Sequence, residues 1–372
     1  MANAPGVIRD SIVDFLSALS GDATISEINE AVALKLGQVS PSSVRSYLNL
    51  NAPGLFERTG RGRYRIRTVA EPNVRHVSLG PAVESGSSVL YHADCFDWLA
   101  SCAPNSIHAV VTDPPYGIVE YSNKEIEKLR NGKGGVWRIP PSFDGHKRAP
   151  LPRFTILDNE DREELFRFFK RLGTLLGRVV VPGGNVLIAS NPLFSHLVAS
   201  AMSESGLELR GYLVRLTMTM RGGDRPKNAH DEFDGVSVMP RSQWEPWVML
   251  RRPLEGRVQD NLRKWKTGGF KRLSAERPFG DVIRSSPTGK AERLIAPHPS
   301  LKPQSFMRQI VRASLPLGVG VVLDPFAGSG STLAAANAVG YSSIGVEADP
   351  KFVRLAAEAI PKLSLVRLID PI

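Results

Sequence analysis

The segment that most constrains the fold is VVLDPFAGSGSTLAAANAVG, residues 321–340. It has the pattern of a buried strand, a glycine turn and an alanine-rich helix. Gly328 and Gly330 let the backbone approach a ligand closely, and the helix that begins behind them offers free N–H groups. Glu347 ends the next predicted strand, SSIGVEAD, where an acid typically accepts hydrogen bonds from ribose hydroxyls. This context predicts a nucleoside cofactor rather than a simple tight turn before a helix.

From residue 89 onward, apolar runs alternate with amphipathic stretches. Strands that alternate with helices predict an α/β fold with a mostly parallel sheet and helices on both faces. The predicted strands are SVLYHAD, IHAVVTD, GNVLIAS, GVVLDPF and SSIGVEAD, and the predicted helices are LFRFFKRLGTLL, FMRQIVRASL and TLAAANAVG. Two segments, 117–158 and 221–300, are rich in Gly, Pro and Arg, which is typical of substrate-facing loops or an inserted subdomain.

A second motif, VVTDPPYG at 110–117, ends a predicted buried strand in an acid, two prolines and a tyrosine. The prolines remove local freedom, so the carboxylate of Asp113 and the carbonyl of Pro114 stay aimed in one direction. Pro115 has no N–H that could compete for these acceptors, and Tyr116 offers a flat face for stacking. The structural alternative is a strand-end turn in which Tyr116 is packed.

These two motifs, DPPYG at 113–117 and DPFAGSGST at 324–332, together resemble the catalytic and cofactor motifs of the S-adenosylmethionine-dependent amino-methyltransferases of DNA. Because the catalytic motif comes first, the chain is similar to the circularly permuted β group, which contains adenine-N6 and cytosine-N4 enzymes. HPSLKP at 298–303 is similar to the family's His-Pro-x-x-Lys-Pro segment. The resemblance implies a Rossmann-like class I methyltransferase fold. It covers residues 89–360, apart from 118–178 and 221–297.

The resemblance also implies a role for each motif residue. Asp113 and the Pro114 carbonyl would accept hydrogen bonds from the target amine, which draws its nitrogen toward a tetrahedral shape and directs the lone pair at the methyl group. Pro115 keeps this frame rigid, and Tyr116 would stack on a base flipped out of the duplex. The residues implied for S-adenosylmethionine are Asp324, Phe326, Gly328 and Gly330 around the methionine part, Glu347 on the ribose, Asp94 on the adenine amine and Lys302 on the methionine carboxylate.

Several of these residues have structural alternatives. Asp94 could cap a helix that begins at Cys95, and Lys302 could be a solvated surface lysine. Asp349 precedes Pro350 at a predicted helix start and is interpreted as a cap rather than a ligand. In QWEPWVMLRR, 243–252, the two tryptophans either form a base-contacting wall or belong to the core.

We therefore predict a site-specific methyltransferase that acts on adenine N6 in duplex DNA by base flipping. A cytosine-N4 enzyme is the alternative in chemistry, because members of that kind more often have Ser in place of Asp at position 113. RNA or protein-glutamine methylation uses a similar Asn-Pro-Pro-Tyr motif in the opposite order. An inactive DNA-binding regulator with a vestigial cofactor fold is the alternative from another class. No Gly-Lys-Ser/Thr follows the glycine turn and no His or Cys residues have ligand spacing, which argues against ATP and against a metal.

The first 70 residues predict a separate winged-helix-like domain, followed by a linker at 71–88 and a methyltransferase domain at 89–365. VIRDSIVDFLSAL has helical spacing, Thr24 is a candidate cap with Glu27 three residues later, and Pro41 fits the first position of a third helix. LFERTGRGRYRIR alternates around two glycines, as a hairpin does. A small helical bundle that binds protein is the alternative.

The net charge of +10 indicates a polyanionic partner. Residues 251–297 hold twelve Lys and Arg against five Asp and Glu, with aromatic residues between them, so we predict a target-recognition insertion at about 221–297. In the N-terminal domain the third helix would present Ser43, Arg45, Tyr47 and Asn49 to DNA. The other cations expected on DNA are Arg61, Arg63, Arg65 and Arg67 on one face of the hairpin, and Arg263, Lys264 and Lys266.

Only two cysteines occur, and no apolar run approaches the length of a membrane span. The N-terminus lacks a signal-peptide pattern, so we expect a cytoplasmic protein of bacterial or phage type. The expected partners are duplex DNA, a cognate restriction endonuclease and a second copy of the chain, with no membrane and no metal.

Overall fold

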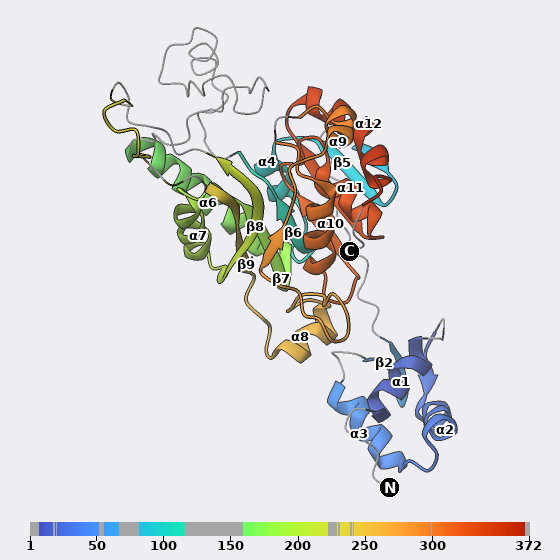
Figure 1. The fold of residues 1–372 in the computed structure, drawn as a ribbon. Coiled ribbons are helices and arrows are strands. Elements are labelled where there is room, and N and C mark those ends of the chain that lie inside the picture. The colour runs from blue at the N-terminus through green and yellow to red at the C-terminus, as the bar shows by residue number, and fades with distance from the viewer. Residues whose placement is uncertain are drawn as a thin grey trace. The chain divides into compact units, whose positions relative to one another are not determined.

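The computed structural model in Figure 1 divides into two compact units, Met1–Asn73 with Glu255–Trp265, and Val74–Leu254 with Lys266–Ile372. The residues that the structure describes are 7–17, 19, 21–51, 56–66, 82–115, 159–221, 229, 231–238, 240, 242–298 and 300–368. Tyr116, Arg67 and the predicted loop 117–158 lie outside these residues.

The N-terminal part of the chain combines three helices with a small antiparallel sheet of order β1-β3-β2. Its elements are α1 (Val7–Ser17), β1 (Ala23–Thr24), α2 (Ile25–Leu36), α3 (Pro41–Asn51), β2 (Phe56–Gly60) and β3 (Arg63–Ile66). Apolar side chains three or four residues apart on each helix meet in one core, because that spacing places them on one helix face. This core contains Ile12, Leu16, Ile28, Val32, Val44, Leu48, Phe56 and Tyr64.

Capping contacts explain where the second helix begins and ends. The Oγ1 of Thr24 accepts a hydrogen bond from the Glu27 N–H, and the Glu27 carboxylate accepts one from the Thr24 N–H at 2.7 Å. This reciprocal capping box confirms the predicted start of α2. Gly37 ends the helix with a φ of 78°, and Pro41 is the first residue of α3, the position expected for it.

The second unit is built on one nine-stranded sheet of order β10-β8-β9-β7-β6-β11-β12-β5-β4. The strands β7, β6, β11, β12 and β5 run parallel, β9 is antiparallel to both of its neighbours, β4 is antiparallel to β5, and β10 is parallel to β8. Their bounds are β4 (Ala82–Ser85), β5 (Ser88–His92), β6 (Ile107–Thr112), β7 (Val180–Ala189), β8 (Glu208–Arg221), β9 (Ser242–Arg251), β10 (Val282–Arg284), β11 (Val321–Asp324) and β12 (Ser342–Glu347).

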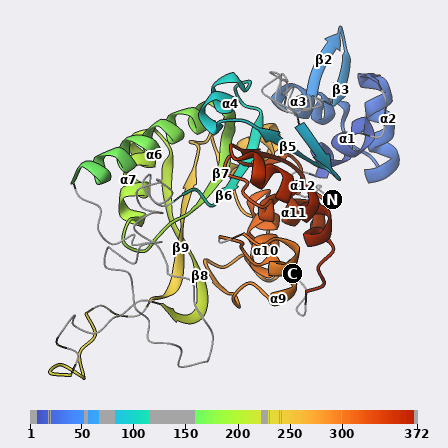
Figure 2. The same ribbon diagram turned by 90° about the horizontal axis from the view of Figure 1, so that it is seen from above.

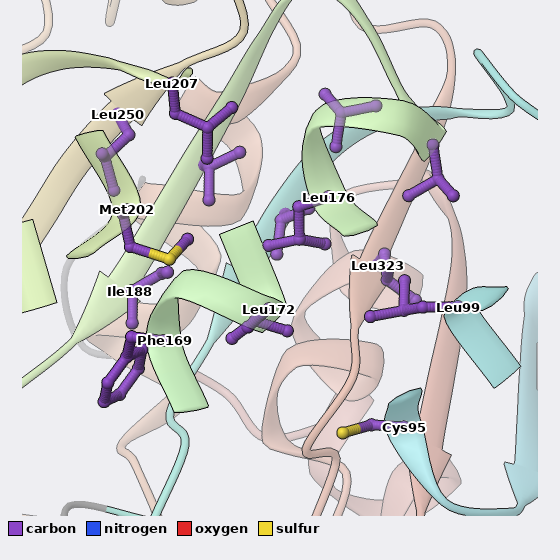
Figure 3. Close-up of a cluster of buried hydrophobic side chains, with 14 of the residues drawn as sticks. Cys95, Leu99, Phe169, Leu172, Leu176, Ile188, Met202, Leu207, Leu250 and Leu323 are labelled. Atoms are coloured by element: carbon purple, nitrogen blue, oxygen red, sulfur yellow. The ribbon is translucent and has the colours of Figure 1, made fainter. Parts of the chain in front are cut away.

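Helices cover both faces of this sheet, as Figures 1 and 2 show. One face carries α4 (Cys95–Ser101), α6 (Asn159–Val179) and α7 (Ser195–Glu204), and the other carries α10 (Gln304–Ser314), α11 (Ser331–Ala338) and α12 (Pro350–Ser364). The strand β6 is buried on both faces because its side chains alternate between the two cores. Val110 packs with α4, α6 and α7, whereas Val111 packs with α10. Figure 3 shows the first core, with Leu172 and Leu176 of α6 near Ile188 of β7.

The structure corrects two of the predicted boundaries. The predicted linker 71–88 ends in β4, which pairs with β5. The predicted insertion 221–297 is not one segment outside the sheet, because β9 pairs with β7 and β8 within it and β10 adds a further strand. Periodicity cannot identify these strands, since β4 and β10 are only four and three residues long and β9 lies in a polar, proline-rich context. The same range also contains α8 (Val258–Trp265) and α9 (Lys290–Ile295).

The strand order places a switch point between β6 and β11. From β11 the chain proceeds to β12 on one side, and from β6 it proceeds to β7 on the other side. In open α/β sheets, ligands bind outside the carboxyl ends of the strands at such a point. Asp113 follows β6 directly and Asp324 ends β11, so both sequence motifs reach this edge.

Candidate active site

Asp113 stands at the carboxyl end of β6 in a largely buried position, with 14% of its side chain exposed. Pro114 is buried and Pro115 is exposed. These prolines follow the strand immediately, which agrees with the rigid frame predicted for the motif. The fourth residue of the predicted catalytic set, Tyr116, lies outside the described residues.

Lys302 forms an ion pair with Asp113, in which the lysine Nζ lies 2.7 Å from Asp113 Oδ2. The same Nζ lies 3.5 Å from Glu245 Oε2 on β9, and the lysine side chain is only 9% exposed. Lys302 is therefore not the solvated surface lysine that the sequence left open. Its expected contact with a cofactor carboxylate stays a prediction, but two carboxylates of the protein already face its ammonium group.

Burial tends to lower the pKa of the Lys302 ammonium, yet the negative charges of Asp113 and Glu245 outweigh it and the pKa is raised. His298, four residues earlier, has its pKa lowered to about 4 by burial and by the positive Lys302. The edge of the sheet therefore holds a permanent lysine cation beside a neutral imidazole at pH 7.

Asp324 ties the two central strands together. Its Oδ1 accepts a hydrogen bond from Thr112 Oγ1 at 2.6 Å and its Oδ2 accepts one from Thr332 Oγ1 at 2.6 Å. The Phe326 N–H also donates to Oδ1, at 3.1 Å. Burial raises the pKa of Asp324 to about 6, although these hydrogen bonds oppose the rise. The Asp324 side chain thus links the end of β6, the end of β11 and the start of α11. Its expected contact with the methionine part of the cofactor stays a prediction.

The glycine loop between β11 and α11 needs its glycines. Gly328 and Gly330 have φ values of 51° and 81°, in the left-handed region that favours glycine. A Cβ on Gly330 would also lie 2.4 Å from Ile360, so the loop could not pack against α12 with a larger residue. A Cβ on Gly328 would approach His298 to 3.4 Å. The loop therefore presents bare backbone at the start of α11, as the sequence predicts for a ligand-binding turn.

Glu347 ends β12 beside this loop. Its Oε2 accepts a hydrogen bond from the Gly328 N–H and its Oε1 accepts one from the Asp349 N–H, both at 2.8 Å. Burial raises the pKa of Glu347, and the two backbone N–H groups oppose that rise. A carboxylate has about four acceptor positions, so two bonds to backbone leave capacity for ribose hydroxyls.

Two predicted acids act as helix caps. Asp94 is the N-cap of α4, where its Oδ1 accepts from the Phe96 and Asp97 N–H groups, and this confirms the structural alternative. Its contact with a cofactor adenine stays a prediction. Asp349 caps α12 through the Lys351 N–H, as expected. Phe326 is half-buried, with its ring 6.0 Å from that of Phe168.

The basic residues of the N-terminal hairpin are balanced by acids. Arg63 Nη2 lies 2.7 Å from Asp22 Oδ1, and Arg65 Nη2 lies 2.8 Å from Glu57 Oε2. The pKa of Asp22 is held well below its usual range by Arg63 and by a Thr59 hydrogen bond. Arg61 lies in the exposed turn between the strands. The predicted row of cations on one face is therefore partly neutralised.

The exposed face of α3 differs from the predicted one. Arg45 and Asn49 are exposed as expected, but Tyr47 packs against the N-terminal core and Ser43 is half-buried. Asn49 Oδ1 accepts a hydrogen bond from the Tyr64 hydroxyl at 3.2 Å. Helical periodicity explains the difference, because Val44 and Leu48 are buried and the helix turn places Ser43 and Tyr47 on the side that packs against the core. The same turn places Arg45 and Asn49 on the opposite side.

The cations predicted near α8 are also paired or partly buried. Arg263 Nη1 lies 3.0 Å from Asp260 Oδ1, and Lys264 is bound to Glu255. Lys266 has a φ of 62°, and burial lowers its pKa. A DNA contact by these three residues stays a prediction.

Sequence reasoning missed four polar residues at this edge of the sheet. Thr112 and Thr332 hold Asp324, and Glu245 and Arg215 extend the charges around Lys302. The available signal was a charged residue within an apolar strand pattern, as in LVRLT of β8 and QWEPW of β9. Of the two tryptophans in QWEPW, Trp247 is fully buried against Phe306, whereas Trp244 is 39% exposed.

Two features are absent from the residues that the structure describes. No helix within them is both long and apolar enough to cross a bilayer. No three of their His, Cys, Asp or Glu side chains are grouped as metal ligands.

Known proteins are similar to this chain in sequence and in fold. The sequence matches the N6_N4_Mtase family, described as DNA methylase, over residues 107–358. This stretch begins with β6 and ends within α12, so it contains the ends of both central strands and the glycine loop.

Individual proteins match along most of their length. The Type II methyltransferase M2.DpnII of Streptococcus pneumoniae is 24% identical over 284 residues, which cover 75% of this chain and 92% of the relative. The Type II methyltransferase M.HindIII of Haemophilus influenzae is 23% identical over 298 residues, covering 73% and 94%. The solved PvuII DNA methyltransferase (cytosine-N4-specific) superimposes with a TM-score of 0.50 at 15% identity, over 79% of this chain and 92% of that one. A likeness at this identity shows the shared fold.

Proposed function

The chain belongs to the DNA methylase family, and on this premise we propose that it transfers a methyl group to the exocyclic N6 of adenine in duplex DNA. It is a DNA methyltransferase, and its methyl donor is S-adenosylmethionine. The proposal rests on one juxtaposition, in which Asp113 at the end of β6 stands beside the glycine loop that follows the neighbouring strand β11.

The target amine needs activation because its lone pair is delocalised into the base. Asp113 and the Pro114 carbonyl would accept hydrogen bonds from its N–H groups, which frees the lone pair and directs it along the transfer axis. A carboxylate has about four acceptor positions, so Asp113 can hold Lys302 and the amine together. The amine proton leaves only after the nitrogen has gained positive charge, so Asp113 serves mainly as an acceptor.

The glycine loop and Glu347 fit the cofactor. The left-handed turns at Gly328 and Gly330 present backbone at the start of α11, and Glu347 retains acceptor capacity for ribose hydroxyls. The sulfonium of S-adenosylmethionine supplies an electrophilic methyl group. The residues of this chain would hold the donor on one side of the β6–β11 boundary and the target amine on the other.

The adenine assignment is supported by the acid at position 113, where cytosine-N4 members of the family more often have Ser. The flipped base would stack on Tyr116, and basic residues of the N-terminal unit and of 251–297 would contact phosphate. In its order of elements, α1-β1-α2-α3-β2-β3, the N-terminal unit fits a winged helix, and we include a DNA-binding role for it in the proposal.

The test is to incubate the full chain with duplex DNA and isotopically labelled S-adenosylmethionine, and then to identify the methylated nucleoside by mass spectrometry. N6-methyladenine is expected, and sequencing of DNA from expressing cells should place it in one sequence context. N4-methylcytosine would replace the adenine assignment. Cofactor and DNA binding without any methylated base would instead favour a DNA-binding regulator.

A further inference from the structure

We propose that Lys302 is a positioning residue for methyl transfer, which holds Asp113 charged and aimed at the target amine and is itself anchored through Glu245 and Arg215. This inference rests on the proposed function of Asp113. It assigns Lys302 to the target side of the site, whereas the sequence resemblance implies a contact with the cofactor carboxylate.

Four side chains from four parts of the fold alternate in charge, and we name them the ion chain: Asp113, Lys302, Glu245 and Arg215. Lys302 Nζ lies 2.7 Å from Asp113 Oδ2 and 3.5 Å from Glu245 Oε2. Arg215 Nη1 lies 3.2 Å from that same Glu245 oxygen. All four side chains are at least 85% buried, so water screens their interactions little.

The far end of the ion chain is fixed by neutral contacts. The Trp247 Nε1–H donates to Glu245 Oε1 at 2.9 Å. Arg215 donates from Nε to Ser285 Oγ at 3.1 Å, and its guanidinium lies 5.4 Å from the centre of the Phe306 ring. Glu245 is therefore held by two donors besides Lys302, and it cannot follow the lysine if that side chain moves.

Asp113 needs a nearby cation because other charges oppose its own. Asp324 on β11 lies close enough for the two carboxyl groups to repel, and Glu245 on β9 adds a second negative charge. Lys302 and, farther along, Arg215 favour a negative Asp113, while His298 is neutral at pH 7. Removal of the ammonium would leave a buried carboxylate among other acids, a situation that favours the protonated form.

A protonated Asp113 would lose acceptor capacity toward the amine, and an untethered one could rotate away. Lys302 contacts Oδ2, so it selects one orientation of the carboxyl plane. The target amine would meet the Asp113 carboxyl group in this orientation. A displacement of about 1 Å in such a group can cost roughly a hundredfold in rate.

The experiment compares Lys302→Met with the matched control Lys362→Met, an exposed lysine in the last turn of α12. Single-turnover methyl transfer is measured from pH 5 to pH 9, together with S-adenosylmethionine affinity by calorimetry. For Lys302→Met we expect a rate that is lower by about one hundredfold, an acid limb that moves up by about one to three pH units, and nearly unchanged cofactor affinity. Lys362→Met should match the wild type in all three.

Glu245→Gln provides an independent arm, because Lys302→Met could fail to fold. This variant keeps the Lys302–Asp113 pair and weakens only its anchor, so the rate should fall by a smaller factor than in Lys302→Met. The acid limb should move down, because a negative charge that opposes the ionisation of Asp113 is removed. Lys302→Arg keeps the charge and should retain the wild-type acid limb at a reduced rate.

Two outcomes overturn the inference: unchanged rate and acid limb in Lys302→Met, or, if that variant does not fold, an unchanged profile in Glu245→Gln. A large loss of cofactor affinity with a normal rate at saturation would place Lys302 on the cofactor instead. Failure of the proposed function looks different, because Asp113→Ala would then retain activity.

Discussion

Two ion pairs in this molecule have the same length and opposite surroundings. Lys302 and Asp113 are 2.7 Å apart at the edge of the large sheet, and Arg63 and Asp22 are 2.7 Å apart in the N-terminal hairpin. The first pair is 9% and 14% exposed, the second 47% and 29%. Water and salt screen the exposed pair, whereas loss of one partner in the buried pair leaves a charge without compensation. Distance alone therefore does not tell which pair controls function.

The largest effect is expected for Asp113→Ala, which should lower methyl transfer by about a thousandfold or more, because the target amine loses its charged acceptor. Cofactor affinity should stay near the wild-type value, since Glu347 and the glycine loop are intact. Turnover kinetics and calorimetry on the same preparation check both parts. Normal turnover in this variant would refute the role of Asp113.

The next effect concerns the two pairs directly. Lys302→Met should lower the free energy of unfolding by about 3 kcal/mol, because Glu245 and Asp113 remain buried without their shared cation. Arg63→Met should leave the free energy of unfolding almost unchanged, because water screens this exposed pair. Urea denaturation of both variants at low and high salt is the measurement. Equal losses of unfolding free energy in the two variants would show that burial does not distinguish the two ion pairs.

Glu347→Ala should weaken S-adenosylmethionine binding by about 1 to 3 kcal/mol, through lost bonds to the ribose and a less ordered Gly328 loop. Calorimetric titration gives this number. The control is Asp349→Ala, which removes the N-cap of α12 two residues after Glu347 but no expected cofactor contact. Equal weakening in both variants would indicate a general loosening of α12.

The raised pKa of Asp324 should make the stability of the fold depend on pH. Its pKa is about 6 in the folded chain against 3.8 as the ordinary value, so the folded state holds the proton more tightly than the unfolded state. The stability that it contributes is complete below pH 3.8 and is lost as the pH rises through about 6. Between pH 5 and pH 7 the wild type should therefore lose about 1 kcal/mol relative to Asp324→Asn. Denaturant unfolding at both pH values tests the sign, and a gain would contradict it.

The smallest effect is expected in the hairpin. Arg61→Gln should reduce the slope of log affinity for DNA against log salt by about one unit if Arg61 contacts a phosphate. Arg63→Gln should change the slope less, because Asp22 already balances that charge. Fluorescence anisotropy over a salt series measures both. If neither slope changes, the hairpin does not contact DNA and a protein partner becomes the better interpretation of this unit.

The features that depend on near neighbours could be predicted from the amino-acid sequence alone. The glycine turn before α11, the acid–proline end of β6 and the caps at Thr24 and Asp349 each involve residues a few positions apart, so their local chemistry can be recognised directly. The alternation of strands and helices predicted the α/β class for the same reason.

The three-dimensional fold was needed to show which distant side chains meet at the carboxyl edge of the sheet. Asp113 directly follows β6, and Lys302 lies in the segment before α10. Arg215 lies on β8 and Glu245 on β9, and no local sequence pattern relates these four residues. The strand order brings them together, and it also turns part of a predicted insertion into β9. Burial then sets the strength of their interactions, because the same ammonium and carboxylate attract strongly inside the protein and weakly in water.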